Sequence, residues 1–225
     1  MVGFVLVHSP LVGPMTWSEV SRVLRDRGHG VAVPSLAGCD PPYWQNHVAR
    51  AVEAAKALGD ARVAVVGHSG AGPLLPLIAT AMGARAACCI YVDAMLPTGG
   101  ASRMERLPAA FAGELHRTAR GGLLPPWGES WPDSLWEELL PDESVRAAFR
   151  AELGPTPVAV YEEAVPEPAT SVSHAYVQFS GAYNEEAADA RARGWRVVQL
   201  DGGHLHMLVR PHAVADALVG LIGPQ

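Results

Sequence analysis

The sequence has few of the residues that would tie a protein to nucleic acid, to a membrane or to a disulfide framework. Lys56 is the only lysine and the net charge is −6, so no basic stripe is present to release counterions from nucleic acid. The longest apolar runs are too short to span a bilayer. There are 3 cysteines, an odd number, and Cys88 and Cys89 are adjacent, which argues against a disulfide framework.

Other signals are missing as well. The N-terminus has neither a cationic segment nor a small-residue cleavage site, so we predict no secretory signal and a cytoplasmic protein. No cysteine and histidine spacing is typical of zinc, and we expect neither a metal nor a cofactor. The chain has 225 residues, of which 49% are apolar and 18% charged. We therefore predict a single domain, residues 1–225, that acts on a small molecule, with no nucleic-acid or membrane partner and with a homodimer left open.

Short apolar segments alternate with longer amphipathic ones over most of the chain. Solid apolar strands separated by helices indicate a parallel sheet with helices on both faces. We predict strands at 4–7, 31–33, 63–66, 88–92, 176–179 and 195–200. We predict helices at 17–27, 44–58, 71–82, 185–193 and 211–222. The predicted fold class is therefore α/β, with about six parallel strands.

The segment from about 96 to 170 interrupts this alternation. It is rich in proline and contains Trp127, Trp131 and Trp136, with helical patches at 134–140 and 142–153. Linkers are not rich in tryptophan. We therefore predict an insertion that folds over the sheet as a small helical lid.

The sharpest motif joins the strand at 63–66 to the following helix. Gly67-His68-Ser69-Gly70-Ala71 matches a nucleophile elbow, G-x-S-x-G, except that Ala71 stands where glycine is usual. Such a turn holds the serine in a strained conformation above the sheet. The flanking positions must be small, because the strand and the helix nearly touch there. An ordinary glycine-rich turn with a capping serine is the alternative interpretation.

A histidine lies in the matching place downstream. His204 follows the last predicted strand directly after Gly202-Gly203. An imidazole with a pKa of about 6.5 can take a proton near neutrality, and a serine nucleophile needs such a base. We assign this role to His204. We expect His206 to line the pocket or to pack under the lid, and no third ligand supports a metal at the His-x-His pair.

Together these motifs resemble the α/β-hydrolase superfamily over nearly the whole chain. The branch they resemble is the small-lid group of plant methylesterases, hydroxynitrile lyases and related bacterial hydrolases. The likeness rests on residues 4–8, Trp17, the elbow at 67–69, the corner at 95–97, and residues 203–207 with Pro211. It implies an α/β-hydrolase fold, no cofactor, and an acid between the serine and the histidine.

The acid departs from the family pattern. The family usually carries it just after the strand that we predict to end at Phe179, but Ala182 fills that position here. Some superfamily members, such as certain haloalkane dehalogenases, place the acid one strand earlier, where Asp93 stands in this chain. We assign the triad acid to Asp93. Glu185 or Glu186, or no acid at all, are the alternatives, and Asp93 could also be a structural turn cap.

The oxyanion hole departs as well. In the resembled family, the residue after His-Gly donates a backbone N–H to the oxyanion. Here the sequence is His8-Ser9-Pro10, and proline has no N–H. The amide of Gly70 remains, and Leu11 or the Ser9 hydroxyl are candidates to complete the hole. A missing donor costs roughly 10²–10³ in rate.

We predict a serine hydrolase that cleaves an ester, thioester or related acyl bond of a small apolar substrate through Ser69, His204 and Asp93. A second hypothesis keeps the same pocket for lyase, decarboxylase or cyclase chemistry on a biosynthetic intermediate. A third is a non-catalytic protein that binds a small ligand.

Overall fold

The computed structural model describes residues 2–97 and 99–222; residue 98 of the predicted insertion, and residues 1 and 223–225 of the predicted domain, lie outside the described residues. One six-stranded sheet has the order β2-β1-β3-β4-β7-β8, and all its neighbouring strands are parallel. The strands are β1 (Gly3–Val7), β2 (Val31–Ala32), β3 (Val63–Ser69), β4 (Ala86–Ala94), β7 (Ser173–Gln178) and β8 (Arg196–Gln199). The predicted six-stranded parallel sheet is confirmed.

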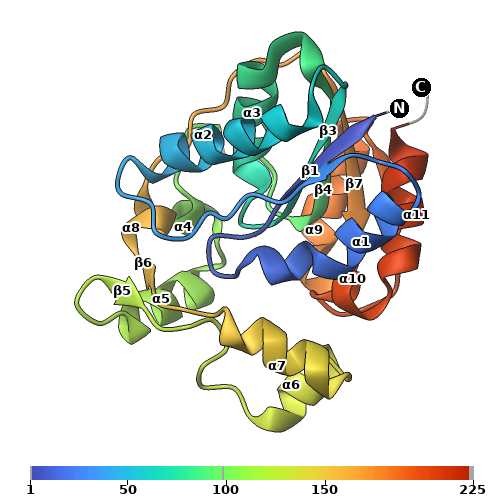
Figure 1. Ribbon diagram of the computed structural model, residues 1–225. Helices are drawn as coiled ribbons and strands as arrows, with labels where there is room; N and C mark the ends of the chain where they lie inside the picture. Colours follow the sequence, from blue (N-terminus) through green and yellow to red (C-terminus); the bar gives the residue numbers. More distant parts are fainter. Residues whose placement is uncertain (1, 98, 223–225) are drawn as a thin grey trace.

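Helices cover both faces of this sheet (Figure 1). One face packs against α1 (Ser18–Asp26), α10 (His206–Val209) and α11 (Pro211–Leu221). The other face packs against α2 (Tyr43–Ala55), α3 (Leu75–Met82) and α9 (Asn184–Ala192). Short 3-10 turns are η1 (Pro14–Trp17), η2 (Lys56–Leu58), η3 (Gly72–Leu74), η4 (Gly83–Arg85) and η5 (Gly181–Tyr183).

Burial on both faces explains why the central strands are apolar without alternation. In β1, Phe4 and Leu6 point into one hydrophobic cluster, and Val5 and Val7 point into the other. A strand with only one covered face would carry polar residues at alternate positions. Continuous apolar strands are therefore the signature of this layered arrangement, and they explain why sequence patterns located the strands well.

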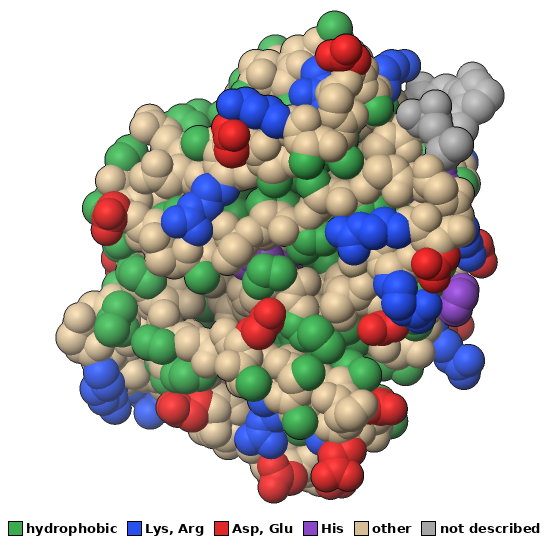
Figure 2. Space-filling model, in the orientation of Figure 1, with side chains coloured by type: hydrophobic (Ala, Val, Ile, Leu, Met, Phe, Trp, Pro, Cys, Tyr) green, Lys and Arg blue, Asp and Glu red, His purple; other side chains and the backbone are tan. Residues whose placement is uncertain are grey.

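The insertion between β4 and β7, which we call the lid, lies beyond one edge of the sheet (Figure 1). Its elements are α4 (Arg103–Arg106), α5 (Ala109–Thr118), β5 (Leu123–Leu124), α6 (Asp133–Leu139), α7 (Glu143–Ala151), β6 (Thr156–Pro157) and α8 (Ala159–Glu162). In its core, Trp127 packs edge to face against Trp136 and Phe149, whose own rings meet at a tilted angle of 54°. On the face drawn in Figure 2, hydrophobic side chains gather where the lid meets the body of the molecule.

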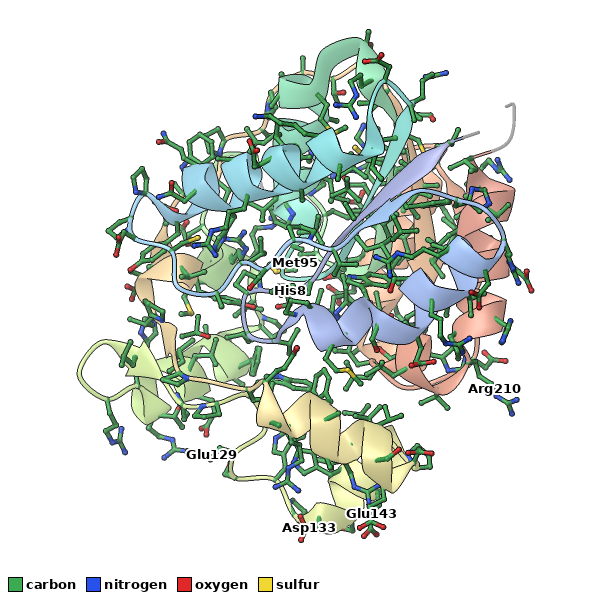
Figure 3. All side chains as sticks on the ribbon, in the orientation of Figure 1. His8, Met95, Glu129, Asp133, Glu143 and Arg210 are labelled. Atoms are coloured by element: carbon green, nitrogen blue, oxygen red, sulfur yellow. The ribbon has the colours of Figure 1, made fainter. Side chains whose placement is uncertain are left out.

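The carboxyl ends of parallel strands meet at one edge of a sheet, and here that edge faces the lid. Figure 3 marks His8 and Met95, which directly follow β1 and β4, on this edge. Ligand sites of open α/β sheets lie at such an edge. Among the described residues, no helix is both long enough and apolar enough to cross a bilayer.

Candidate active site

The backbone at Ser69 is strained. Ser69 ends β3 with φ of 55°, in the left-handed region that a residue with a Cβ seldom adopts. A Cβ on Gly67 would lie 2.7 Å from Cδ2 of Leu75, and one on Gly72 would overlap the carbonyl oxygen of Met95. The contact with the backbone that only a glycine allows therefore falls on Gly72. This is one residue after the last glycine of the G-x-S-x-G motif, whose place Ala71 takes here, buried and without a clash.

Asp93 and His204 are joined by a hydrogen bond. Nδ1 of His204 lies 2.7 Å from Oδ2 of Asp93, which is fully buried at the end of β4. A carboxylate accepts at that distance, so neutral His204 carries its proton on Nδ1 and leaves Nε2 as an acceptor. The sequence prediction paired these two residues, and the structure brings them together across 111 positions of the chain.

Three further hydrogen bonds fix the Asp93 carboxylate. Its Oδ1 accepts the backbone N–H of Phe179 at 2.9 Å and that of Ser180 at 3.0 Å. The Ser180 hydroxyl donates to Oδ2 at 2.7 Å. Phe179 and Ser180, which follow β7 where the family usually carries the acid, thus hold the carboxylate of Asp93 from β4.

The elbow also holds the loop of the histidine. Nε2 of His68 donates to the backbone oxygen of His204 at 3.0 Å. Burial lowers the pKa of His68 well below its ordinary value, so the ring stays neutral. His68, which follows Gly67 in the motif, therefore connects the nucleophile turn to the loop that carries the base.

Tyr183 covers both Ser69 and His204. Its hydroxyl lies 3.2 Å from Oγ of Ser69, and its ring stacks on the imidazole with centroids 5.1 Å apart and planes at 8°. Burial, the main cause, raises the pKa of the phenol above its ordinary value, so the hydroxyl stays protonated. Among the hydrogen bonds of the described residues, none joins Ser69 to the His204 ring.

A small cavity lies over these side chains. It has a volume of about 20 Å³, room for one or two waters. Ser9, Leu11, Val12, His68, Ser69, Trp127, His204 and Leu205 line it. A cavity of this size cannot hold a substrate, so the lid must move or a side chain must swing aside for one to enter.

Two larger hollows adjoin this cavity. One, of about 350 Å³, is lined mainly by lid residues, among them Phe111, Leu115, Trp127 and Trp131. Another, of about 540 Å³, lies between the lid and the loop around Pro10. Leu11 lines all three spaces, and Trp127 lines both the small cavity and the 350 Å³ hollow. These two side chains separate the hollow from Ser69.

The loop after β1 has no N–H at Pro10, and the N–H of the next residue, Leu11, is directed to the Ser9 side chain. The N–H of Leu11 donates to Oγ of Ser9 at 3.4 Å, and the Pro10 carbonyl accepts from Thr156 of the lid at 3.3 Å. Nδ1 of His8 bonds to the Ser9 carbonyl at 2.8 Å, and its Nε2 accepts the Leu36 N–H at 3.1 Å. Ser9 lines the small cavity with its loop fixed on both sides.

The other sequence candidates lie elsewhere. The ring of His206 packs against Phe179 at 5.3 Å between centroids, and His206 is not among the residues that line the small cavity. Glu185 and Glu186 stand in the first turn of α9, and neither bonds to His204. In the part of the chain that the structure describes, no group of three or more side chains could hold a metal ion.

Two residues near the site escaped the sequence analysis as site candidates. Tyr161 and Arg103 come from the lid, where no motif marks them. The Arg103 side chain is fully buried; its Nε donates to the Gly70 carbonyl at 2.6 Å and its Nη1 to that of Val160 at 3.0 Å.

Comparison with known proteins gives one family model and one curated relative over nearly the whole chain. Residues 4–217 match the model of the alpha/beta hydrolase family. A carbendazim hydrolyzing esterase from Nocardioides sp. (strain SG-4G) is 25% identical over 249 positions, covering 98% of this chain and 100% of that protein.

Solved structures share the fold at lower identity. One is an extracellular alpha/beta-hydrolase from a Paenibacillus species, which is described as sharing structural and functional homology with tobacco salicylic acid binding protein 2. It has a TM-score of 0.80 and 18% identity, and the match covers 98% of this chain and 99% of that chain. A pyrethroid hydrolase from Sphingobium faniae JZ-2 has a TM-score of 0.77 and 19% identity, covering 98% and 97%.

Proposed function

The chain belongs to the alpha/beta hydrolase family, and on that premise we propose that it is a serine hydrolase that cleaves an ester, thioester or related acyl bond of a small apolar substrate. At the level of the family it is a hydrolase. The observation that carries the finer proposal is the 2.7 Å bond from His204 to buried Asp93 beside a cavity that Ser69 also lines.

The first step is acylation of Ser69. Its hydroxyl turns from Tyr183 to Nε2 of His204, which takes the proton as Oγ attacks the carbonyl carbon. Asp93 holds the imidazole in the required tautomer and stabilises the imidazolium that forms. The Gly70 N–H donates to the oxyanion, and the Ser9 hydroxyl is a further donor on the cavity wall.

Collapse of the tetrahedral intermediate breaks the bond to the alcohol or thiol, which leaves with the proton from His204. Water then attacks the acyl-enzyme, with His204 again as the base, and free Ser69 returns. The protein supplies every group in this cycle, so no cofactor is required.

The apolar substrate class follows from the surroundings of the site. The hollow of about 350 Å³ beyond Leu11 and Trp127 is lined mainly by aromatic, aliphatic and proline side chains, with Glu114, Arg120 and Glu129 among the polar residues of its wall. Hollows of this size suit a small organic molecule held mostly by apolar contact. The carbendazim hydrolyzing esterase and the pyrethroid hydrolase are named for small organic substrates, which supports the same class for this chain.

The test combines a covalent probe with a single substitution. A fluorophosphonate should label the wild type on Ser69, and p-nitrophenyl esters should be hydrolysed. Ser69→Ala should lose both activities with an unchanged melting temperature, because it removes one hydroxyl and keeps the backbone. Ser134→Ala, on exposed α6, is the matched control. Turnover of the ester by Ser69→Ala at most of the wild-type rate would refute nucleophilic catalysis.

The missing N–H at Pro10 favours a second candidate. A site with one oxyanion donor stabilises a tetrahedral intermediate poorly, and Ser69 and His204 would then serve acid–base work in lyase, decarboxylase or cyclase chemistry. A wild type that neither reacts with the fluorophosphonate nor cleaves any ester would support this alternative.

A further inference from the structure

We propose that Tyr161 of the lid is a positioning residue of the oxyanion hole, where it directs the Ser9 hydroxyl to replace the backbone N–H that Pro10 cannot supply. This inference rests on the proposed function and extends it to a residue outside the triad and its loops.

The first observation is the place of the Tyr161 hydroxyl. A Cβ on Gly70 would lie 2.6 Å from this hydroxyl and 3.2 Å from Oγ of Ser9. Both hydroxyls therefore lie against the α-carbon of Gly70, the residue whose N–H is the proposed oxyanion donor. Glycine after the nucleophile is therefore a packing requirement: a larger residue at position 70 would displace the phenol.

The second observation is the hydrogen bonding of the pair. The two hydroxyl oxygens are 3.5 Å apart, and the Leu11 N–H also points at Oγ of Ser9. Among the described residues, Ser9 is the single hydrogen-bond partner of the Tyr161 hydroxyl. That hydroxyl is buried, and we assign it as the donor because the Ser9 oxygen is the one acceptor within reach of its proton among the described residues. Since Ser9 then accepts from both neighbours, its own proton is free to point into the cavity.

The third observation is how the lid holds Tyr161. Arg103 bridges the Gly70 carbonyl of the elbow and the Val160 carbonyl, one residue before Tyr161. Its guanidinium lies 6.0 Å from the centre of the Tyr161 ring. A buried cation that ties the lid to the nucleophile turn fixes the phenol there, and its charge favours an anion beside Gly70.

A hydrogen bond of 3.5 Å is long in the resting site. This bond should shorten in the transition state, because the Ser9 oxygen becomes a stronger acceptor for the Tyr161 proton when Ser9 itself donates to the oxyanion. Loss of a whole oxyanion donor costs roughly 10²–10³ in rate. Loss of the residue that orients one should cost less, and we expect a decrease of about tenfold in kcat.

The experiment uses Tyr161→Phe, with Tyr43→Phe as the matched control and a p-nitrophenyl ester as substrate. Tyr161→Phe should lower kcat about tenfold with little change in KM. The affinity of a trifluoromethyl ketone, which forms an oxyanion on Ser69, should fall by the same factor. Adding Pro10→Ala should restore activity to Tyr161→Phe by supplying a backbone N–H, and should change the wild type much less.

Each outcome decides one claim. Activity of Tyr161→Phe within about twofold of the wild type would overturn the role of Tyr161 and leave the hydrolase intact. Lower kcat with unchanged affinity for the ketone would reduce Tyr161 to a packing residue and overturn the role as well. A wild type that is inert to both fluorophosphonate and esters would refute the proposed hydrolase, and this inference with it.

Discussion

The hydroxyl of Tyr183 lies 3.2 Å from Oγ of Ser69, while its ring stacks on His204. One side chain thus contacts both partners of the expected proton transfer. In the resting site, the Ser69 hydroxyl is bonded to the phenol and not to the imidazole. Attack on a substrate therefore requires Ser69 to give up this bond and turn to Nε2.

The two parts of Tyr183 should act in opposite directions. Tyr183→Phe keeps the stacked ring and removes the competing bond, which is worth about 0.5–1.5 kcal/mol, so it should speed inactivation by a fluorophosphonate by about two- to tenfold. Tyr183→Ala also removes the support of His204 and should slow the same reaction. Inactivation slower than the wild type in Tyr183→Phe would mean that the hydroxyl assists Ser69 instead of restraining it.

Asp93 is the residue on which the triad assignment depends. Asp93→Asn keeps the shape of the side chain but gives Nδ1 of His204 an amide that can donate, which favours the wrong tautomer. We expect kcat to fall by about 10⁴, as for triads in general. Glu185→Gln, in α9, is the matched control, since Glu185 is exposed and does not bond to His204. Loss of activity in the glutamate variant with retention in Asp93→Asn would reverse the assignment.

The sheet and the placement of the triad candidates could be predicted because each leaves a local signal. A strand buried on both faces is apolar without alternation, and a turn at the end of such a strand shows as Gly67-His68-Ser69. Asp93 required elimination, since only the absence of an acid at Ala182 pointed to the earlier strand.

The helical patches predicted at 134–140 and 142–153 correspond to α6 and α7, but the shortest elements of the lid could not be predicted in the same way. Its helices α4 and α8 are one turn long, and their positions depend on tertiary contacts such as Arg103 with the elbow. Nothing local marks Tyr161 as a neighbour of Gly70, 91 positions earlier in the chain by the numbering. The helix at 206–209 was missed for a similar reason, because a single turn has no periodicity to detect.

Buried neutral histidines should make stability depend on pH. Burial lowers the pKa of His8 to about 4 and that of His47 to about 4, whereas both have a pKa of about 6.5 in the unfolded chain. His8 also accepts the Leu36 N–H, which its protonated form cannot do. Below pH 6.5 the unfolded state therefore binds more protons. The free energy of unfolding should fall by about 1.4 kcal/mol per pH unit for each histidine as the pH decreases toward 4.

Urea unfolding at several pH values between about 7 and 5 would measure this slope. His47→Gln should make this slope shallower by about 1.4 kcal/mol per pH unit, which corresponds to one proton. Glu186, whose pKa is raised by burial, changes the slope in the opposite direction. Because Glu186 is present in both proteins, its contribution cancels when His47→Gln is compared with the wild type. Equal slopes for the two proteins would show that folding does not lower the pKa of His47.

Leu11 should control which substrates reach Ser69. It separates a cavity of about 20 Å³ at the triad from a hollow of about 350 Å³. Leu11→Ala removes most of the side chain and should join the two spaces. The ratio of kcat/KM for p-nitrophenyl octanoate to that for the acetate should therefore rise, by about tenfold if the added chain buries two methylenes more than in the wild type. The gain should appear in KM, because the added contact forms with the bound substrate as well as in the transition state.

The control is Leu135→Ala, which changes an exposed leucine of α6 and should leave the ratio unchanged. A ratio that stays constant in Leu11→Ala would show that the acyl chain enters by another route, with the 540 Å³ hollow beside Pro10 as the next candidate.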